Sequence, residues 1–208
     1  MLKKMMLAAA AVMMLAACNG SKETHLSAQF GDDAPDRVKV TVGKKFDMSV
    51  PLKDGKLELD VPVDVTVLSH VKAGTSVFSF VSDGSKITLN MQEGKAYSDK
   101  KKGVHSRFVA YNRWLEDFLS AYRAKADSFG SDKDAADAYF QEKQDEYVAY
   151  HKATVKANKD NIVGLMALRR IQSDDAKEML SLIKSFSSEM QQLPELADLK
   201  KEYEEALK

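Results

Sequence analysis

The hydrophobic pattern of the chain changes its period once, near Gly103. Over residues 26–97, apolar and polar residues alternate in short runs, which is the pattern of half-buried β-strands. After Gly103, apolar residues recur every three or four positions, which is the pattern of amphipathic helices. No linker rich in serine, glycine or proline separates the two parts, and residues 99–103 form the only candidate joint. The sequence therefore predicts an α+β protein, with its strands first and its helices second.

The strand-rich part is predicted over residues 25–98 as an antiparallel β-sandwich or a partly open barrel. Seven or eight short runs of alternating residues are separated there by turn signals at regular spacing, which is typical of such units. Lys53-Asp54-Gly55-Lys56 is a strong hairpin signal, because aspartate followed by glycine tolerates positive φ at both central positions of a tight turn. Ser82-Asp83-Gly84-Ser85 is a second turn of this kind.

The helical part is predicted over residues 99–208 as an array of about five helices with short connections, packed on the strands. Gly130-Ser131 separates the first helix from the second, and Asn161 can cap a short apolar helix that we expect to be buried. A further helix begins after Ser173-Asp174-Asp175, and Pro194 suits the first turn of the last one. One face of the first helix carries Phe108, Tyr111, Leu115, Phe118 and Tyr122.

The first residues of the chain have the three parts of a secretory leader. Lys3 and Lys4 precede an apolar run over residues 5–17, and Leu15-Ala16-Ala17-Cys18 looks like a bacterial lipobox. We expect residues 1–17 to be removed as a lipoprotein signal peptide, which leaves a covalent lipid on Cys18 and a tether over residues 18–24. The alternative is an ordinary signal peptide that happens to end near a cysteine.

The predicted membrane contact is an anchor, because an apolar run of roughly 13 residues is too short to cross about 30 Å of hydrocarbon comfortably. A modified cysteine that carries more than one acyl chain would satisfy the two-signal requirement for stable anchoring. Asn19 stands where some bacteria use an aspartate for retention in the inner membrane. We therefore expect an outer-membrane lipoprotein of the bacterial cell envelope, on the periplasmic face or the cell surface.

Cys18 is the only cysteine, so its acylation would leave the mature protein without a free thiol. Disulfides, thiol nucleophiles, cysteine-based zinc sites and Cys-x-x-Cys redox chemistry are then excluded. The 31 basic residues balance the 31 acidic ones. A balanced chain has no overall electrostatic attraction to nucleic acid, and we expect no nucleic-acid partner.

Several segments resemble a known module. Phe46-Asp47-Met48-Ser49-Val50 leads into residues 53–59, residues 78–89 end in Ile87-Thr88-Leu89, and residues 161–168 begin with Asn161 and continue as a short apolar helix. Together they resemble a β-rich domain of unknown function in Bacteroidetes-type lipoproteins. In that family the domain usually precedes a thioredoxin-like domain, in proteins similar to thiol-disulfide interchange proteins of the envelope. This sequence stops at Lys208, about where that domain begins, and contains no Cys-x-x-Cys, so the resemblance assigns redox activity to no residue here.

The candidate titratable residues are dispersed. No pair of histidines has the i, i+4 spacing of a helical zinc site. We expect His105, near a helix start, to be exposed, and His151, on an apolar stripe, to border the core. Asp32-Asp33-Asp36 and Asp132-Asp134-Asp137 lack the glycine and terminal glutamate of a calcium loop, and we expect them to serve a turn and a helix start. The remaining histidines are His25, expected on the tether, and His70. The sequence therefore predicts no catalytic residue, no metal site and no cofactor besides the lipid.

The most binding-like group in the sequence is aromatic: Tyr111, Trp114, Phe118 and Tyr122. We expect Trp114 to lie off the stripe of the other three, partly exposed, where it can stack on a ligand or partner. The alternative is that all four rings pack the helix against the sheet.

These observations favour a lipid-anchored, non-catalytic binding or interaction module in the cell envelope. One alternative is an accessory module that docks on a thioredoxin-like thiol-disulfide oxidoreductase of the envelope. The other is an enzyme, such as a hydrolase, that uses the dispersed aspartates and histidines.

Overall fold

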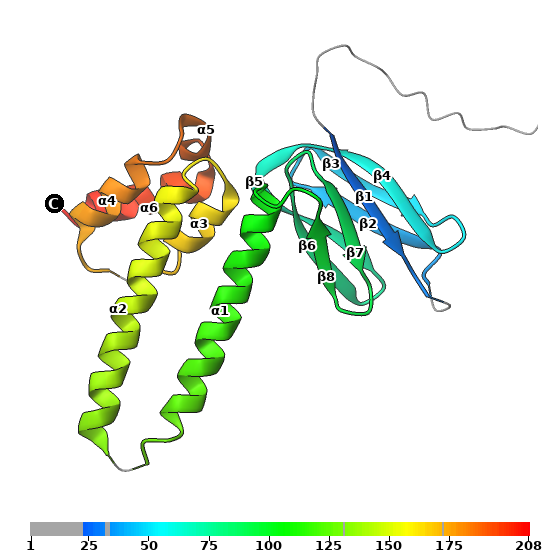
Figure 1. Ribbon diagram of the computed structural model, residues 1–208. Coiled ribbons are helices and arrows are strands. Elements are labelled where there is room, and N and C mark those ends of the chain that lie inside the picture. Colours follow the sequence, from blue (N-terminus) through cyan, green and yellow to red (C-terminus); the bar gives the residue numbers. More distant parts are fainter. Residues whose placement is uncertain (1–22, 32–33, 131, 172) are drawn as a thin grey trace, which may run out of the picture.

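The computed structural model describes residues 23–31, 34–130, 132–171 and 173–208. Eight strands in two sheets are followed by six helices, so the predicted α+β order is confirmed (Figure 1). The two sheets are separate and are not closed into a barrel. Of the two predicted arrangements, the strands therefore follow the sandwich. The predicted signal peptide and lipidated Cys18 lie outside the described residues.

The strands end at Ser98 and the helices begin at Val104, close to the predicted change of hydrophobic period near Gly103. The strands are β1 (Glu23–Gln29), β2 (Arg37–Val42), β3 (Phe46–Pro51), β4 (Lys56–Pro62), β5 (Asp64–Ala73), β6 (Ser76–Ser82), β7 (Lys86–Asn90) and β8 (Lys95–Ser98). The helices are α1 (Val104–Ala126), α2 (Lys133–Ala157), α3 (Ile162–Leu168), α4 (Ala176–Lys184), α5 (Ser188–Gln191) and α6 (Pro194–Glu205). Because Glu23 and Thr24 already belong to β1, the predicted tether ends earlier than residue 24.

The strand order is β4-β1-β7-β8 in one sheet and β3-β2-β5-β6 in the other. All neighbouring strands are antiparallel except β1 and β7, which are parallel. The turn at Asp83-Gly84 carries the chain from β6 in one sheet to β7 in the other, and so closes no hairpin.

The turn at Asp54-Gly55 has the predicted local conformation, with φ of 53° and 68°. Lys53 and Lys56 exchange both backbone hydrogen bonds across it, at 3.1 and 2.9 Å. The flanking strands then separate, because β3 pairs with β2 and β4 pairs with β1 in the opposite sheet. The predicted hairpin is therefore wrong beyond its two-residue turn, which instead carries the chain from one sheet to the other.

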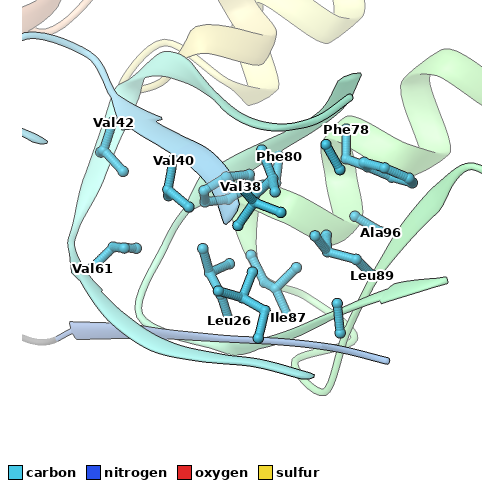
Figure 2. Close-up of a cluster of buried hydrophobic side chains, with 14 of the residues drawn as sticks. Leu26, Val38, Val40, Val42, Val61, Phe78, Phe80, Ile87, Leu89 and Ala96 are labelled. Atoms are coloured by element: carbon cyan, nitrogen blue, oxygen red, sulfur yellow. The ribbon is translucent and has the colours of Figure 1, made fainter. Parts of the chain in front are cut away.

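The two sheets pack through their apolar inner faces (Figure 2). In β1, β2 and β7 every second side chain points inward and is buried, whereas β3 at the sheet edge has no buried side chain. This core includes Leu26, Val38, Val40, Val42, Leu57, Val61, Phe80, Ile87 and Leu89.

A second core is formed by the helices and the end of the strand region. Figure 1 shows α1 and α2 as a long hairpin that points away from the sheets, while α3 to α6 gather at its base. The expected burial of α3 is confirmed, since Val163, Leu165 and Leu168 are almost completely buried. The segment between Asp175 and Pro194, predicted as one helix, is divided by Ser187, which caps α5, so there are six helices where about five were predicted.

The junction between the two parts depends on Asp83 and His105. Gly103, the N-cap residue of α1, has no side chain to cap the helix. Asp83 supplies the cap from the turn between the sheets, because its Oδ2 accepts a hydrogen bond from the backbone N–H of His105 at 2.9 Å. A Cβ atom at residue 103 would collide with that same oxygen, which explains the glycine.

His105 is completely buried, so the expectation that it is exposed was wrong. Its Nδ1 accepts a hydrogen bond from the backbone N–H of Val81 in β6 at 3.2 Å, so the ring proton lies on Nε2. Nε2 donates to the carbonyl of Ala96 in β8 at 3.1 Å. One imidazole therefore connects α1 to both sheets. The sequence predicted correctly that His105 lies at a helix start. It is buried because this helix start packs against β6 and β8.

We expect Asp83→Ala to lower the free energy of unfolding by about 2 kcal/mol, since it removes the cap of α1 and the acceptor for Ser85. Urea denaturation followed by circular dichroism measures the change. Asp117→Ala, on the exposed face of α1, is the matched control and should change the stability little. Equal stability of the two variants would contradict the role of Asp83.

Candidate functional site

The polar groups of the described residues form no metal site. Nowhere in these ranges do three or more histidine, cysteine, aspartate or glutamate side chains converge as metal ligands would. Within the same ranges, no helix has the length and apolar character needed to cross a membrane. Asp132 caps α2 by accepting a hydrogen bond from the backbone N–H of Ala135, as expected for a helix-start residue, whereas Asp32 and Asp33 lie outside the described residues.

The four histidines are not brought together. His25 lies in β1 and not on a tether, His70 in β5 contacts the hydroxyl of Ser79 at 3.2 Å, and His105 is at the junction already described. The buried carboxylate Asp64 is also satisfied by its surroundings. It accepts hydrogen bonds from Thr66 and pairs with Lys45 at 3.0 Å. These groups have structural partners, and none of them lines a large hollow.

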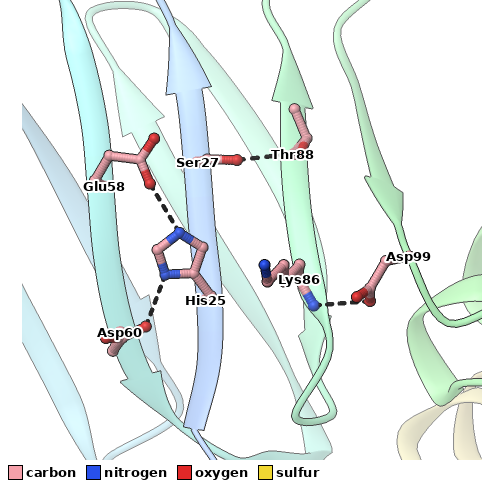
Figure 3. A network of polar contacts seen from close by, with 7 residues as sticks. All are labelled: His25, Ser27, Glu58, Asp60, Lys86, Thr88 and Asp99. Carbon is pink, nitrogen blue, oxygen red and sulfur yellow. Dashed lines mark hydrogen bonds and ion pairs between the residues drawn. The ribbon is translucent and has the colours of Figure 1, made fainter.

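His25 lies between two carboxylates on the outer face of its sheet (Figure 3). Its Nδ1 is 2.8 Å from Asp60 and its Nε2 is 2.8 Å from Glu58, both in β4. Residue 60 is the direct cross-strand partner of residue 25, and residue 58 is on the same face two positions along. The hydrogen bond to Asp60 is the main cause that raises the pKa of His25, against a smaller opposing effect of burial. Ser27 pairs with Thr88 beside this group, at 3.1 Å.

We expect His25 to make the stability depend on pH above neutrality. Because its folded-state pKa is raised, the contribution is complete below the unfolded value of about 6.5 and is lost as pH rises through the folded value. The loss of unfolding free energy between pH 6 and pH 8.5 should therefore be smaller in His25→Gln than in the parent protein. Urea denaturation at both pH values measures this difference. Ser27→Ala, on the same face, should behave like the parent, and an unchanged slope in His25→Gln would refute the assignment.

The hairpin of α1 and α2 is held together by aromatic rings. Trp114 stacks on Tyr150 with ring centroids 3.4 Å apart and on Phe118 at 5.0 Å. Phe118 contacts Tyr147 of α2 at 5.5 Å. Further along the hairpin, Tyr122 meets Phe140 at 5.4 Å. Such ring pairs contribute on the order of 1 kcal/mol each beyond their buried area.

All four aromatic residues singled out in the sequence belong to this arrangement. Tyr111 is almost completely buried, and Trp114, Phe118 and Tyr122 are half-buried. Trp114 is not off the stripe: residues 114, 118 and 122 follow one another at i, i+4 spacing, and Tyr111 precedes Trp114 by three positions. Trp114 is partly exposed, as expected, but its ring stacks on Tyr150 within the protein.

His151 is enclosed in the base of this hairpin, which agrees with its expected place at the core. It stacks on Tyr147 at 4.1 Å, and its Nε2 is 3.3 Å from the hydroxyl of Tyr111. Its Nδ1 has no hydrogen-bond partner among the described residues. Burial, followed by the positive charge of Arg170, lowers the pKa of His151 to about 4. The imidazole is therefore neutral at ordinary pH.

A cleft of about 380 Å³ lies beside the aromatic rings, between the hairpin and the end of α3. Its walls combine aromatic rings with three cationic side chains, and they include no aspartate, glutamate or histidine among the described residues. The lining residues are Phe118, Leu119, Tyr122, Lys143, Gln144, Tyr147, Arg169 and Arg170.

The cationic part of this cleft was not predicted from the sequence. Arg169 and Arg170 directly follow the buried helix α3, and both are exposed. The signal present in the sequence was a pair of arginines directly after an apolar run. Their position opposite Phe118 and Tyr147 depends on how α3 packs between the long helices, and the sequence does not contain that information directly.

Two smaller hollows lie elsewhere. One of about 280 Å³ lies between α1 and the edge strands β6 and β8, where Val77 and Tyr97 are exposed and Arg113 contributes a charge. The other, of about 160 Å³, shares Phe118, Tyr122 and Lys143 with the large cleft and also contacts Trp114. Both volumes are below the usual range of ligand pockets, roughly 300–1,000 Å³.

The chain matches no protein-family model, no curated protein and no solved structure.

Proposed function

We propose that this protein is a lipid-anchored, non-catalytic binding module of the bacterial cell envelope. The leader and its lipobox at Cys18 support the anchor. The cleft between the hairpin and α3 supports the binding role, and it is the observation that carries this part of the proposal.

The chemistry of the cleft favours binding over catalysis. Its polar groups in the described part of the chain are arginine, lysine, glutamine and tyrosine, with no carboxylate, histidine, serine or cysteine. A general base at neutral pH needs a pKa near the working pH. The pKa of Lys143 is raised, mainly by its hydrogen bond to Glu146, so that its amine remains charged. Such a site can hold and orient a ligand.

The other buried titratable groups have structural tasks. His105 joins α1 to both sheets, and Asp64 is held by Thr66 and Lys45. His151 is neutral and enclosed by rings, so it meets no substrate directly. Because His105, Asp64 and His151 are engaged in structural contacts, they are not candidates for catalysis. This is consistent with the proposed binding role.

Replacement of Cys18 by alanine tests the anchor. In the native bacterium or an equivalent host, we expect Cys18→Ala to remain unprocessed or to be released from the membrane fraction, since the lipid acceptor is gone. Metabolic labelling with a radioactive fatty acid and fractionation of the envelope measure both effects. Ser21→Ala leaves the acceptor in place and should be labelled and anchored like the parent. Identical labelling and fractionation of Cys18→Ala and the parent would refute the anchor.

A further inference from the structure

We propose that the cleft between the α1–α2 hairpin and the end of α3 binds a small organic anion, in which a carboxylate or phosphate group is attached to a flat or apolar body. This inference deepens the proposed binding function, on which it rests. It follows from the size of the cleft, the uncompensated arginines on one side and the aromatic rings on the other.

Arg169 and Arg170 provide the anion-binding side. Neither makes an ion pair with any of the described residues. The polar neighbours of Arg170 include Tyr147 and Tyr111, which are not carboxylates and form no ion pair with it. A guanidinium presents several N–H donors in a planar fork that matches a carboxylate or phosphate.

Lys143 lies on the α2 side of the same cleft, but it contributes less net charge. Its amine is 2.5 Å from Glu146, which compensates much of its charge. The excess positive charge of the cleft therefore comes mainly from the two arginines. The whole chain is neutral, with 31 basic and 31 acidic residues, so this excess is a local property of the site and not of the protein as a whole.

The rings define the second half of the ligand. Phe118, Tyr122 and Tyr147 line the cleft and are half-buried, so part of each ring remains accessible. Phe118 of α1 and Tyr147 of α2 pack against each other in this wall, with centroids 5.5 Å apart. A flat or apolar group placed against these rings removes apolar surface from water while its acidic group meets the arginines.

The volume of the cleft, about 380 Å³, favours a small molecule or the acidic end group of a larger one. Both kinds of ligand have an acidic group next to a flat or apolar body, but they differ in whether they need contacts outside the cleft. A free anion fills the cleft alone, whereas an end group requires contacts outside it. Benzoate, which has only the ring and the carboxylate, is therefore the probe for the shared chemistry.

Binding can be followed by the fluorescence of Trp114, the only tryptophan of the chain. Its ring stacks on Phe118, which lines the cleft. We expect benzoate to change this fluorescence saturably in the full-length processed protein, with benzamide at least about tenfold weaker because it lacks the charge. Raising the salt concentration should weaken the binding of benzoate and leave the binding of benzamide nearly unchanged. Inorganic phosphate, which has no ring, should bind more weakly than phenyl phosphate.

Single substitutions locate the site. Arg169→Gln and Arg170→Gln should each raise the Kd for benzoate by about tenfold or more, since each removes a charged donor. Arg170→Lys, which keeps the charge, should retain part of the affinity, whereas a purely packing role of Arg170 would predict equal losses in both variants. Arg113, which lines the separate hollow near β8, provides the control. Arg113→Gln removes the same charge and should bind benzoate like the parent. Thermal melts of all variants test whether each is folded.

The outcomes separate this inference from the proposed function. If benzamide binds as tightly as benzoate, or if the arginine variants bind normally while folded, the anion specificity is refuted and the binding module stands. If no probe binds the parent at about 10 mM, or if Arg113→Gln alone abolishes binding, the cleft is not the anion site. Recovery of a chemically altered probe would instead refute the non-catalytic function. If phenyl phosphate and benzoate bind only weakly but peptides ending in phenylalanine bind well, the ligand is the acidic end of a larger molecule.

Discussion

The hydrogen bond between the Asp83 carboxylate and the backbone N–H of His105 fixes how the helical part stands on the sheets. Asp83 lies in the turn that carries the chain from one sheet to the other, and His105 lies in the first turn of α1. The imidazole then bonds to both β6 and β8, so the start of α1 is held at three points within a buried environment. From this joint, α1 and α2 extend away from the sheets as a hairpin (Figure 1).

The hairpin in turn depends on rings. Aromatic pairs such as Trp114 with Tyr150 occupy the space between α1 and α2, where smaller apolar side chains would allow the helices to approach more closely. Helix α3 packs at the base of the hairpin, and Gly164 allows it to lie against the end of α2, because a Cβ there would collide with the carbonyl of Asn158. This packing places the residues after α3 beside Phe118 and Tyr147, so the cleft is a consequence of the helix spacing.

The fold class was accessible from the sequence because the hydrophobic period follows directly from which side chains a strand or a helix buries. The pairing of the strands was harder to predict from the sequence. Asp54-Gly55 determines two backbone conformations, but the partners of β3 and β4 depend on which sheet each strand covers, and that is a tertiary property. The burial of His105 and the approach of Arg170 to Tyr147 have the same origin. The position of Trp114 was different: its i, i+4 spacing to Phe118 was present in the sequence and was misjudged.

The neutral state of His151 completes the electrostatic description of the cleft. Its pKa of about 4 results from burial and, second, from the charge of Arg170, so protonation would require a second positive charge beside an existing one in a poorly solvated place. Between about pH 5 and pH 8 the imidazole therefore adds no charge behind the cleft wall. Arginine side chains in proteins are charged throughout this range. The proposed attraction of the cleft for an anion should thus be independent of pH within this range, until the anion itself is protonated.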